Sequence, residues 1–485
     1  MFSNLRNNDK IYKNLYNGEW IESSSQKLIE IFSPVDGSSL GKVQAMTTEE
    51  VDMAIKNTKE ALKSWQETSL NERVDIIYKA ANILEENSEE IATLMMMEIS
   101  KDKKSCVSEV VRTADLLRFT ADTAKSMQGE ALSGDSFPGG SKSKMAFVSR
   151  EPLGTVLAIA PFNYPINLSA SKIGPAIVAG NTVILKPPTQ GSLSALCLAE
   201  VFNKAGLPAG VLNTVTGRGS EIGDYLISHE GINFINFTGS TAVGQHIASL
   251  SKMVPLLLEL GGKDAAIILE DANLEEAATN IVNGAYSYSG QRCTAVKRIL
   301  TFDSVADKLI PLLKEKIEKL KVGNPAEDGV VITPLIDNKS ADFVEGLIKD
   351  AKDSGATLVT GGTRENNTIY PTLFDNVTTD MRLAWEEPFG PVLPLIRVSS
   401  IDEAIEIANK SEYGLQSSVF TQDIDKAFYI AKKLEVGTVQ INNKTERGPD
   451  HYPFLGVKSS GMGTQGIRYS IEAMSRPKAI VLNIK

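Results

Sequence analysis

Residues 156–160 have the sequence VLAIA, and the runs TVIL at 182–185, VLNTV at 211–215 and FINF at 234–237 share its apolar, β-rich character. Helical patterns at 192–205 and 220–228 lie between these runs. Strands that alternate with helices in this way are typical of βαβ units around a parallel sheet. The region from about residue 151 is therefore predicted to form an open α/β domain.

A second series of the same kind follows Gly261 and Gly262. Its predicted strands lie at 265–269, 298–302, 392–398, 417–421 and 438–441, and its predicted helices at 274–286, 305–320, 401–409 and 424–434. Two Rossmann-like domains with open parallel sheets are the economical interpretation. We expect residues 1–128 and 150–262 to form a cofactor-binding domain and residues 263–445 a catalytic domain.

The first 128 residues are predicted to be mainly helical, with helices at 48–67, 70–86, 89–98 and 104–127. The next segment, 129–144, is rich in Gly, Ser and Lys and reads as an exposed connection. Residues 145–149 and 479–484 alternate like edge strands and have no obvious partners. They predict a small extra sheet that subunits could share, within bridging segments at 129–149 and 446–485.

Length and composition are those of a globular protein of two or three domains, with 485 residues, 42% of them hydrophobic and 23% charged. A net charge of −10 argues against a nucleic-acid partner, because phosphate backbones are bound mainly by clustered Lys and Arg. The sequence has neither a signal-peptide pattern nor an apolar run long enough to span a membrane. We therefore expect a cytoplasmic protein without a membrane partner.

Cysteine and histidine are too few and too scattered for a metal centre or a disulfide framework. The three cysteines are Cys106, Cys197 and Cys293, and the three histidines are His229, His246 and His451. We expect no metal and no histidine-based triad.

Cys293 lies in Ser289-Gly290-Gln291-Arg292-Cys293-Thr294, among residues that are poor core material. A catalytic cysteine attacks as the thiolate and needs a setting that lowers its pKa from about 8.5, which Arg292 and a nearby predicted helix could provide. A lone cysteine is more often a small buried hydrophobe. Cys106 and Cys197, within helical patterns, keep that interpretation.

Glu259 ends the apolar run 254–258, where a carboxylate is costly unless it is paired, neutralised or functional. Desolvation would raise its pKa, which suits a general base for water. A surface glutamate at a strand end is the plainer interpretation. Together with Cys293, however, Glu259 supplies the two groups needed to form a thioester and then hydrolyse it.

Asn163 follows the predicted strand 156–160, where open α/β sheets present ligand-binding groups. Its amide and the backbone N–H of Cys293 could stabilise an oxyanion, although asparagine is also common in turns. Lys186 follows the strand 182–185 and could meet a ribose phosphate, which Thr189 carries no carboxylate to repel. Glycines in the run 239–244 could let backbone amides approach a pyrophosphate, but their spacing is not that of the usual dinucleotide fingerprint.

The combination of motifs resembles the aldehyde dehydrogenase superfamily, in that family's order and over essentially the whole chain. The motifs are FNYP at 162–165, KPPT at 186–189, FTGS at 237–240, ELGGK at 259–263, GQRCT at 290–294 and EPFGP at 387–391. Residues 186–192, 383–391 and 442–448 further resemble the branch of NADP-dependent, non-phosphorylating glyceraldehyde-3-phosphate dehydrogenases.

The resemblance implies a role for each matching position. Cys293 would be the nucleophile, Glu259 the base for deacylation, and Asn163 part of the oxyanion hole. The cofactor residues would be Lys186 and Thr189 at the adenosine 2′-phosphate, Gly239, Ser240 and Gly244 at the pyrophosphate, Glu387 at the nicotinamide ribose and Phe389 beside the nicotinamide. The substrate phosphate would be bound by Arg112, Tyr164, Arg292 and Arg447. Each arginine alone is more often a structural or solvated charge, so the substrate assignment depends on the combination.

The resemblance thus implies oxidation of D-glyceraldehyde 3-phosphate to 3-phosphoglycerate, through a cysteine thioester that water hydrolyses. It favours NADP over NAD, because Thr189 stands where NAD-preferring relatives commonly carry a glutamate. It also implies a homo-oligomer, with a tetramer favoured over a dimer. A dehydrogenase for another anionic aldehyde, such as succinate semialdehyde, is the alternative, and a non-catalytic relic of the fold is a second.

Overall fold

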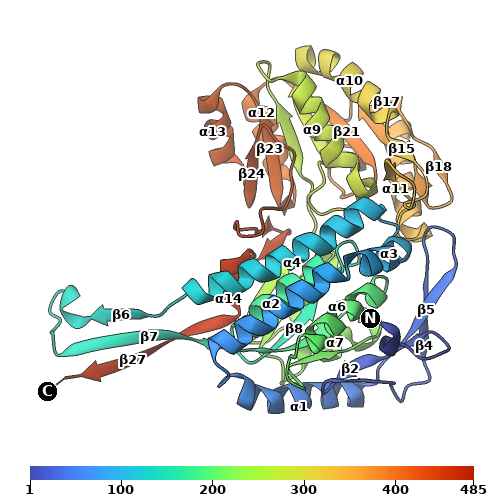
Figure 1. Ribbon diagram of the computed structural model, residues 1–485. Helices are drawn as coiled ribbons and strands as arrows, with labels where there is room; N and C mark the ends of the chain where they lie inside the picture. Colours follow the sequence, from blue (N-terminus) through green and yellow to red (C-terminus); the bar gives the residue numbers. More distant parts are fainter. Residues whose placement is uncertain (485) are drawn as a thin grey trace.

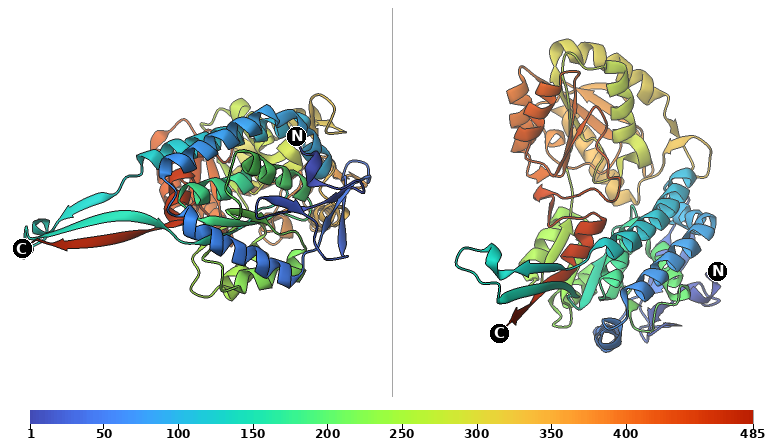
Figure 2. Two further views of the ribbon diagram at one scale, coloured as in Figure 1. Left: turned by 60° about the horizontal axis from the view of Figure 1, so that its bottom comes forward. Right: turned by 60° about the vertical axis from the view of Figure 1, so that its left-hand side comes forward.

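The structure, a computed structural model, describes residues 1–484. Two lobes are each built around a mainly parallel sheet, and a long arm projects from one of them (Figures 1 and 2). The predicted fold class is confirmed: two open sheets of the Rossmann type and a small additional sheet. None of the helices within residues 1–484 is both long and apolar enough to cross a membrane.

The first lobe contains a sheet of six strands in the order β10-β9-β8-β11-β12-β26. Their bounds are Leu212–Thr214, Thr182–Lys186, Thr155–Ile159, Phe234–Thr238, Leu256–Glu259 and Gly461–Met462. The first five run parallel and only β26 is antiparallel. Strands β8, β9 and β11 are buried along their whole length, which explains why their sequences are continuous apolar runs rather than alternating ones.

Helices connect and cover this sheet. They are α1 (Thr48–Trp65), α2 (Leu70–Glu86), α3 (Ser88–Ile99), α4 (Lys103–Ser126), α5 (Asn167–Val178), α6 (Ser192–Lys204), α7 (Gly219–Ser228), α8 (Thr241–Leu250) and α14 (Ile467–Ala473). Capping boxes begin α1 and α2: Thr47 pairs with Glu50 and Ser69 with Glu72, which satisfies the free amides of each first turn. The four helices predicted before residue 128 are confirmed to within two residues at each end.

The second lobe contains a sheet of seven strands in the order β17-β20-β21-β14-β13-β23-β24. Their bounds are Thr357–Thr360, Thr372–Asp375, Val392–Val398, Arg298–Phe302, Ala265–Ile268, Gln416–Phe420 and Thr438–Ile441. Only the edge strand β17 is antiparallel to its neighbour. The helices of this lobe are α9 (Leu274–Tyr286), α10 (Asp303–Glu318), α11 (Asn338–Asp353), α12 (Ile401–Lys410) and α13 (Ile424–Lys433).

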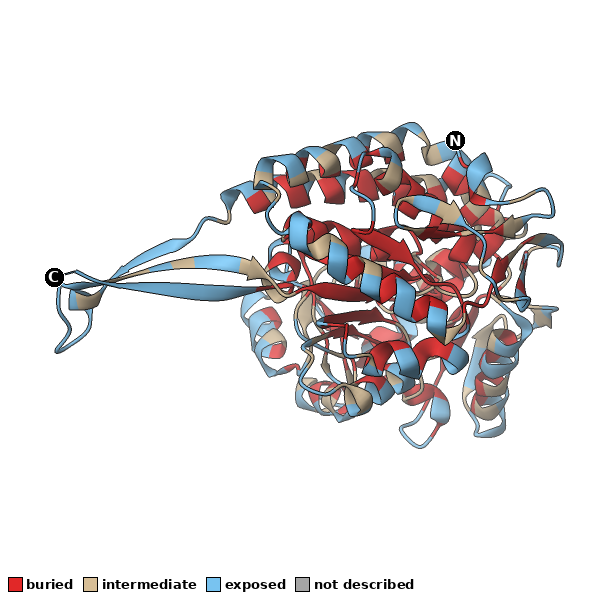
Figure 3. Cartoon of the chain, turned by 90° about the horizontal axis from the view of Figure 1, so that it is seen from below, coloured by how far each residue is buried: buried red, intermediate tan, exposed pale blue. Residues whose placement is uncertain are grey.

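The arm is a three-stranded antiparallel sheet in the order β27 (Ser475–Asn483), β7 (Lys144–Pro152) and β6 (Glu130–Ser133). The two edge-like segments seen in the sequence therefore pair with each other. The arm stands away from the body and is mostly exposed, including large apolar side chains such as Phe147 and Ile480 (Figure 3). Of the expected bridging segment 446–485, only β27 lies in the arm: β26 joins the first sheet and α14 packs on α4 and α5.

Several elements had no counterpart in the prediction. The N-terminal region forms a sheet of β1 (Ile11–Tyr12), β5 (Ser39–Gln44) and β4 (Leu28–Phe32), and a hairpin of β2 (Asn14–Tyr16) and β3 (Glu19–Ile21). Helix α5 was also not predicted, because all of its residues are buried and its sequence lacks the one-sided apolar period of a surface helix. Helices α11 and α14 and strands β17 and β20 were not predicted either. Neither were three small strand pairs: β15 (Lys321–Val322) with β16 (Val330–Ile332), β18 (Arg364–Glu365) with β19 (Thr368–Ile369), and β22 (Tyr413–Gly414) with β25 (Val457–Lys458).

Candidate functional site

The predicted site residues of the first lobe lie where parallel strands end. Asn163 follows β8, Lys186 ends β9, Ser240 follows β11 and Glu259 ends β12. The carboxyl ends of parallel strands meet at one edge of a sheet, which is where open α/β folds bind ligands. Cys293 comes from the second lobe, in the loop after α9. The two lobes therefore supply different parts of one site.

A cavity of about 110 Å³ brings the predicted catalytic and substrate residues together. It is lined by Arg112, Tyr164, Asn167, Leu168, Glu259, Arg292, Cys293, Thr294, Glu446 and Arg447. The thiol, the buried carboxyl group and all four residues expected to bind the substrate phosphate thus share one space. Asn163 lies beside it, because its Nδ2 donates a hydrogen bond of 3.0 Å to the carbonyl of Gln291, two residues before the cysteine.

The loop before Cys293 has an unusual backbone. Tyr288 and Ser289 have φ angles of 52° and 51°, in the left-handed region that ordinary residues seldom adopt. Gly290 follows with φ of 71°, and a Cβ there would lie 2.4 Å from the carbonyl oxygen of Gly390, so only glycine fits. This turn places Cys293 at the cavity with a partly exposed side chain, whereas Cys106 and Cys197 are buried as predicted. Strain of this kind is often found at functional sites.

The electrostatic setting of Cys293 differs from the one expected. Burial and the neighbouring Glu259 carboxylate raise the pKa of the thiol well above its ordinary value, while Lys297 lowers it. Arg292 does not serve as the activating cation, because its guanidinium turns to the carbonyls of Asn283 and Gly284 near the end of α9. The expectation that Arg292 lowers the pKa of the thiol was therefore wrong.

Glu259 is 1% exposed, and neither of its carboxyl oxygens has a hydrogen-bond partner within residues 1–484. Burial raises its pKa, against the opposing effects of Arg447, the Cys293 thiol and Lys172. A carboxyl group without structural partners in such a place needs a functional explanation.

Lys172, which the sequence analysis missed, lies beside this carboxyl group. It belongs to the unpredicted helix α5, is fully buried and donates a 2.7 Å hydrogen bond to Oγ1 of Thr238. Burial, together with the charge of Arg447, lowers its pKa to about 7, while Glu259 acts in the other direction.

The arginines of the cavity are not equally free. Arg112 makes two hydrogen bonds to the carboxylate of Asp450, at 2.8 and 2.9 Å, and a third to the carbonyl of Arg447 at 3.0 Å. Arg447 approaches the same carboxylate only at 3.8 Å, and its buried Nη1 has no partner within residues 1–484. Arg447 therefore has a donor group to offer a ligand, whereas Arg112 is already engaged by Asp450, a residue that the sequence analysis did not single out.

The expected adenosine end of the cofactor site has a buried cation. Lys186 is buried, and its Nζ contacts the carbonyl of Pro187 at 3.2 Å. Burial lowers its pKa to about 8. Thr189 is partly exposed on the following loop, where it faces a small cavity that Ile29 and Val43 of the unpredicted N-terminal sheet help to line. An ammonium group that has no anionic partner within residues 1–484 suits a phosphate.

The start of α8 follows the glycine-rich turn after β11. Ser240 is exposed and its side chain does not cap the helix, which leaves the first amides of α8 available to an anion. Gly239 has no room for a side chain, because a Cβ would lie 2.5 Å from the ring of Phe237. Gly244 packs against the other side: its Cβ would lie 2.3 Å from Cδ2 of Leu260, so glycine lets α8 approach β12.

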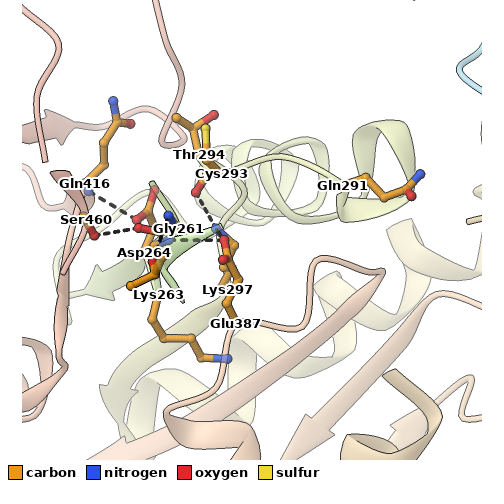
Figure 4. A network of polar contacts seen from close by, with 12 residues as sticks. Gly261, Lys263, Asp264, Gln291, Cys293, Thr294, Lys297, Glu387, Gln416 and Ser460 are labelled. Carbon is orange, nitrogen blue, oxygen red and sulfur yellow. Dashed lines mark hydrogen bonds and ion pairs between the residues drawn. The ribbon is translucent and has the colours of Figure 1, made fainter. Parts of the chain in front are cut away.

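Glu387 and Phe389 approach the cysteine loop from the second lobe. Lys297 lies between Cys293 and Glu387: its Nζ donates to the carbonyl of Cys293 and is 2.9 Å from the Glu387 carboxylate (Figure 4). Glu387 also accepts a 3.2 Å hydrogen bond from the amide of Gly262. Phe389 packs edge-on against Phe162 at 5.9 Å, so the residues expected at the nicotinamide end also converge.

Comparison with known proteins agrees with this geometry. Residues 20–480 match the aldehyde dehydrogenase family. The NADP-dependent glyceraldehyde-3-phosphate dehydrogenases of Streptococcus equinus and Pisum sativum are 60% and 50% identical to the chain; each alignment covers 98% of this chain, with 99% and 96% of the respective relative.

A solved structure with the same fold is that of the NADP-dependent glyceraldehyde-3-phosphate dehydrogenase from Bacillus halodurans C-125, complexed with NADP. It superposes with a TM-score of 0.96 at 56% identity, covering 98% of this chain and 99% of the other. The resemblance predicted from the motifs is thus confirmed, and the chain belongs to the aldehyde dehydrogenase family.

Proposed function

We propose that this protein oxidises D-glyceraldehyde 3-phosphate to 3-phosphoglycerate with NADP, through a thioester on Cys293 that water hydrolyses. The observation that carries the proposal is one cavity that holds Cys293, Glu259 and Arg447. Among the described residues 1–484, the Glu259 carboxyl group and Nη1 of Arg447 have no hydrogen-bond partner. The names of the relatives, which are NADP-dependent glyceraldehyde-3-phosphate dehydrogenases, support the choice of substrate and cofactor.

In the first step the Cys293 sulfur, as the thiolate, adds to the aldehyde carbon. The carbonyl oxygen becomes an oxyanion, which the Asn163 amide and the backbone N–H of Cys293 would stabilise. Within residues 1–484 the Asn163 side chain makes one hydrogen bond, to the carbonyl of Gln291 in the cysteine loop, which supports this placement. Lys297 favours the thiolate because its charge lowers the pKa of Cys293. When bound, NADP supplies the acceptor for the hydride that leaves the same carbon, and a thioester results.

In the second step a water molecule attacks the thioester carbon, the carbon–sulfur bond breaks, and the acid is released with the thiolate restored. Glu259 would take the proton from this water. Its raised pKa makes it a stronger base than an exposed carboxylate, which suits that role. Because water and not inorganic phosphate is the acceptor, no acyl phosphate forms.

The residues present fit an NADP molecule. The buried Lys186 ammonium and the uncharged Thr189 would hold the 2′-phosphate, and Gly239, Ser240 and Gly244 the turn and helix start for the pyrophosphate. Glu387 would bind the nicotinamide ribose and Phe389 would flank the nicotinamide ring. NAD remains a weaker alternative, since its ribose leaves the charge of Lys186 unpaired.

The substrate phosphate would meet Arg447 first, with Tyr164, Arg112 and Arg292 around it. Nη1 of Arg447 has no hydrogen-bond partner in the described part of the chain, and Arg112 is already bound to Asp450; both observations support this order. Guanidinium groups match phosphate geometry and form strong charge-assisted hydrogen bonds with it.

The direct test is formation of NADPH and 3-phosphoglycerate from D-glyceraldehyde 3-phosphate in buffer without inorganic phosphate. Absence of turnover would reject the proposal. Succinate semialdehyde and an uncharged aldehyde, each assayed with NADP and with NAD, separate the alternative substrate. A higher kcat/KM for succinate semialdehyde than for the phosphorylated aldehyde would favour that alternative.

We also propose the domain division expected from the sequence, with one amendment. The six-stranded and seven-stranded sheets support a cofactor domain of 1–128 and 150–262 and a catalytic domain of 263–445, and the positions of β26 and α14 suggest assigning 461–473 to the former. The exposed apolar residues of the arm support a homo-oligomer in which this sheet binds another subunit. The tetrameric state and the cytoplasmic location remain predictions.

A further inference from the structure

Lys101 is a buried cation outside the chemistry described so far. It lies between α3 and α4, is 2% exposed, and forms an ion pair of 2.6 Å with the equally buried Glu109. Burial lowers the pKa of a lysine, but Glu109 and other neighbouring groups outweigh this effect, so the pKa of Lys101 is raised above its ordinary value. Replacing such a pair with apolar residues is often neutral or stabilising, so its presence asks for a reason other than stability.

Two contacts of the Lys101 ammonium group lead to the loop that carries Asn163. Its Nζ lies 3.4 Å from the carbonyl oxygen of Asn163 and 3.5 Å from the ring centroid of Tyr164. A desolvated cation over an aromatic face is attracted by the negative charge density of that face. One ammonium group therefore contacts both the backbone carbonyl of Asn163 and the side chain of the next residue, Tyr164.

Glu109 holds the other end of the same loop. Its Oε1 accepts hydrogen bonds of 3.1 Å from the amides of both Ile166 and Asn167, at the start of α5, while Oε2 pairs with Lys101. The loop 163–167 is thus fixed at its first residue by Lys101 and at its last by Glu109. Charge-assisted bonds of this kind are among the stronger ones in proteins.

The same lysine also reaches the lobe that carries the nucleophile. Its Nζ is 5.1 Å from the ring centroid of Tyr288, whose ring packs edge-on against Tyr164 and whose hydroxyl donates to the carbonyl of Ile99 at 3.0 Å. Tyr288 begins the left-handed turn that leads to Cys293. One cation therefore contacts both the oxyanion loop and the turn before the nucleophile.

We propose that Lys101, which is held in place by its ion pair with Glu109, is a positioning residue. It keeps Asn163 of one lobe at the correct distance and orientation from Cys293 of the other. Lys101 does not touch the reacting atoms; it acts through the backbone of Asn163 and the rings of Tyr164 and Tyr288. This inference rests on the proposed function only in that Cys293 must oxidise an aldehyde with an oxyanion stabilised by Asn163.

A double-mutant cycle tests the inference. The variants are Lys101→Met, Asn163→Ala and the two combined, and the readout is the rate of the first NADPH burst with NADP saturating. Removing one oxyanion donor typically slows the chemical step by about 100- to 1000-fold. A displacement of about 1 Å costs up to about 100-fold, so Lys101→Met should slow the burst substantially while the KM for NADP stays near the wild-type value.

The decisive comparison is between the double variant and Asn163→Ala. If Lys101 acts through Asn163, the double variant should be within about twofold of Asn163→Ala alone, because the lysine then has nothing left to position. An undiminished effect of Lys101→Met in the Asn163→Ala background would overturn the proposal, and so would a wild-type burst rate in Lys101→Met itself.

Two further variants serve as a control and as a replacement for Lys101→Met. Lys103→Met removes a neighbouring charge that contacts Thr93 and Glu89 on the surface, and it should leave the burst unchanged. If Lys101→Met does not fold, Glu109→Gln takes its place in the cycle, since it keeps an acceptor for the two amides and removes the counter-ion. All rates are also measured with an unphosphorylated aldehyde: inactivity of the wild type with every aldehyde would reject the proposed function, whereas an active wild type with independent effects would reject only the role of Lys101.

Discussion

Replacing Glu259 with glutamine should separate the two halves of the proposed reaction. The substitution preserves the size of a buried side chain, and it removes the only function that we assign to it, the acceptance of a proton from water. General bases contribute about 100- to 10,000-fold to a rate, so hydrolysis of the thioester should slow by that factor. Formation of the thioester needs no water and should remain fast. Rapid mixing should therefore show a burst of one NADPH per active site and then near-arrest.

The pH dependence adds a second, independent expectation. Because burial raises the pKa of Glu259, the base is fully ionised only above the ordinary carboxyl range, and wild-type hydrolysis should quicken with pH up to that raised value. The residual hydrolysis of Glu259→Gln should lack this rise. A variant without any burst, or with the wild-type pH profile, would show that Glu259 does not act as the deacylating base.

As the pH rises, the stability of the wild-type protein should fall while its rate of thioester hydrolysis increases. A carboxyl group whose pKa is higher in the folded than in the unfolded chain binds its proton more tightly when folded. The free energy of unfolding therefore falls as pH rises from the ordinary carboxyl pKa through the raised one. Glu259→Gln removes this loss, so its melting temperature relative to wild type should improve as the pH rises above the ordinary carboxyl pKa. A folded, more stable and yet stalled enzyme cannot be explained by unfolding.

The remaining predictions concern ligand recognition. Arg447→Gln should raise the KM for the phosphorylated aldehyde by about 10- to 100-fold, as expected for the loss of a charged hydrogen bond, and Arg112→Gln should raise it less. Steady-state kinetics measure both effects, with an uncharged aldehyde as the control. Equal effects of the two substitutions would contradict the proposed primary role of Arg447. NADP affinity, measured by fluorescence titration, should weaken above pH about 8, where free Lys186 loses its proton, whereas NAD affinity should not. Thr189→Glu should weaken NADP binding and spare NAD; parallel losses for both would count against a 2′-phosphate site at Thr189.

Most of the fold could be predicted because its elements leave strong local patterns. The parallel strands are continuous apolar runs, and helices such as α2 and α9 begin at capping residues and end where their periodicity stops. Helix α5 leaves no such pattern, since a helix buried on every side has no polar face, and Pro175 within it reads as a break. The N-terminal strands are only two to six residues long, too short to show a clear alternating pattern, and they pair with one another.

The candidate catalytic residues could be recognised in the sequence because each stands at the end of a strand or in a distinctive loop. The charged groups that surround these residues could not be predicted from the sequence. Asp450 binds Arg112 across 338 residues of sequence, and nothing near either residue indicates that contact. The cation beside Cys293 is Lys297, four residues later, rather than its neighbour Arg292, because the turn at Tyr288 and Ser289 directs the arginine towards α9. Charge partners depend on tertiary geometry, which local sequence does not carry.

Glu259, Lys172 and Arg447 form one electrostatic unit, although they come from β12, α5 and the loop after β24. Arg447 lowers the pKa of both other groups, and Glu259 and Lys172 shift each other. Protons that leave interacting groups belong to the set and not to one residue. A phosphate bound at Arg447 would reduce the effect of its positive charge on Glu259 and Lys172, and would therefore raise the pKa of both. The substrate that the cavity accepts should thus make its own base stronger, which an uncharged aldehyde cannot do.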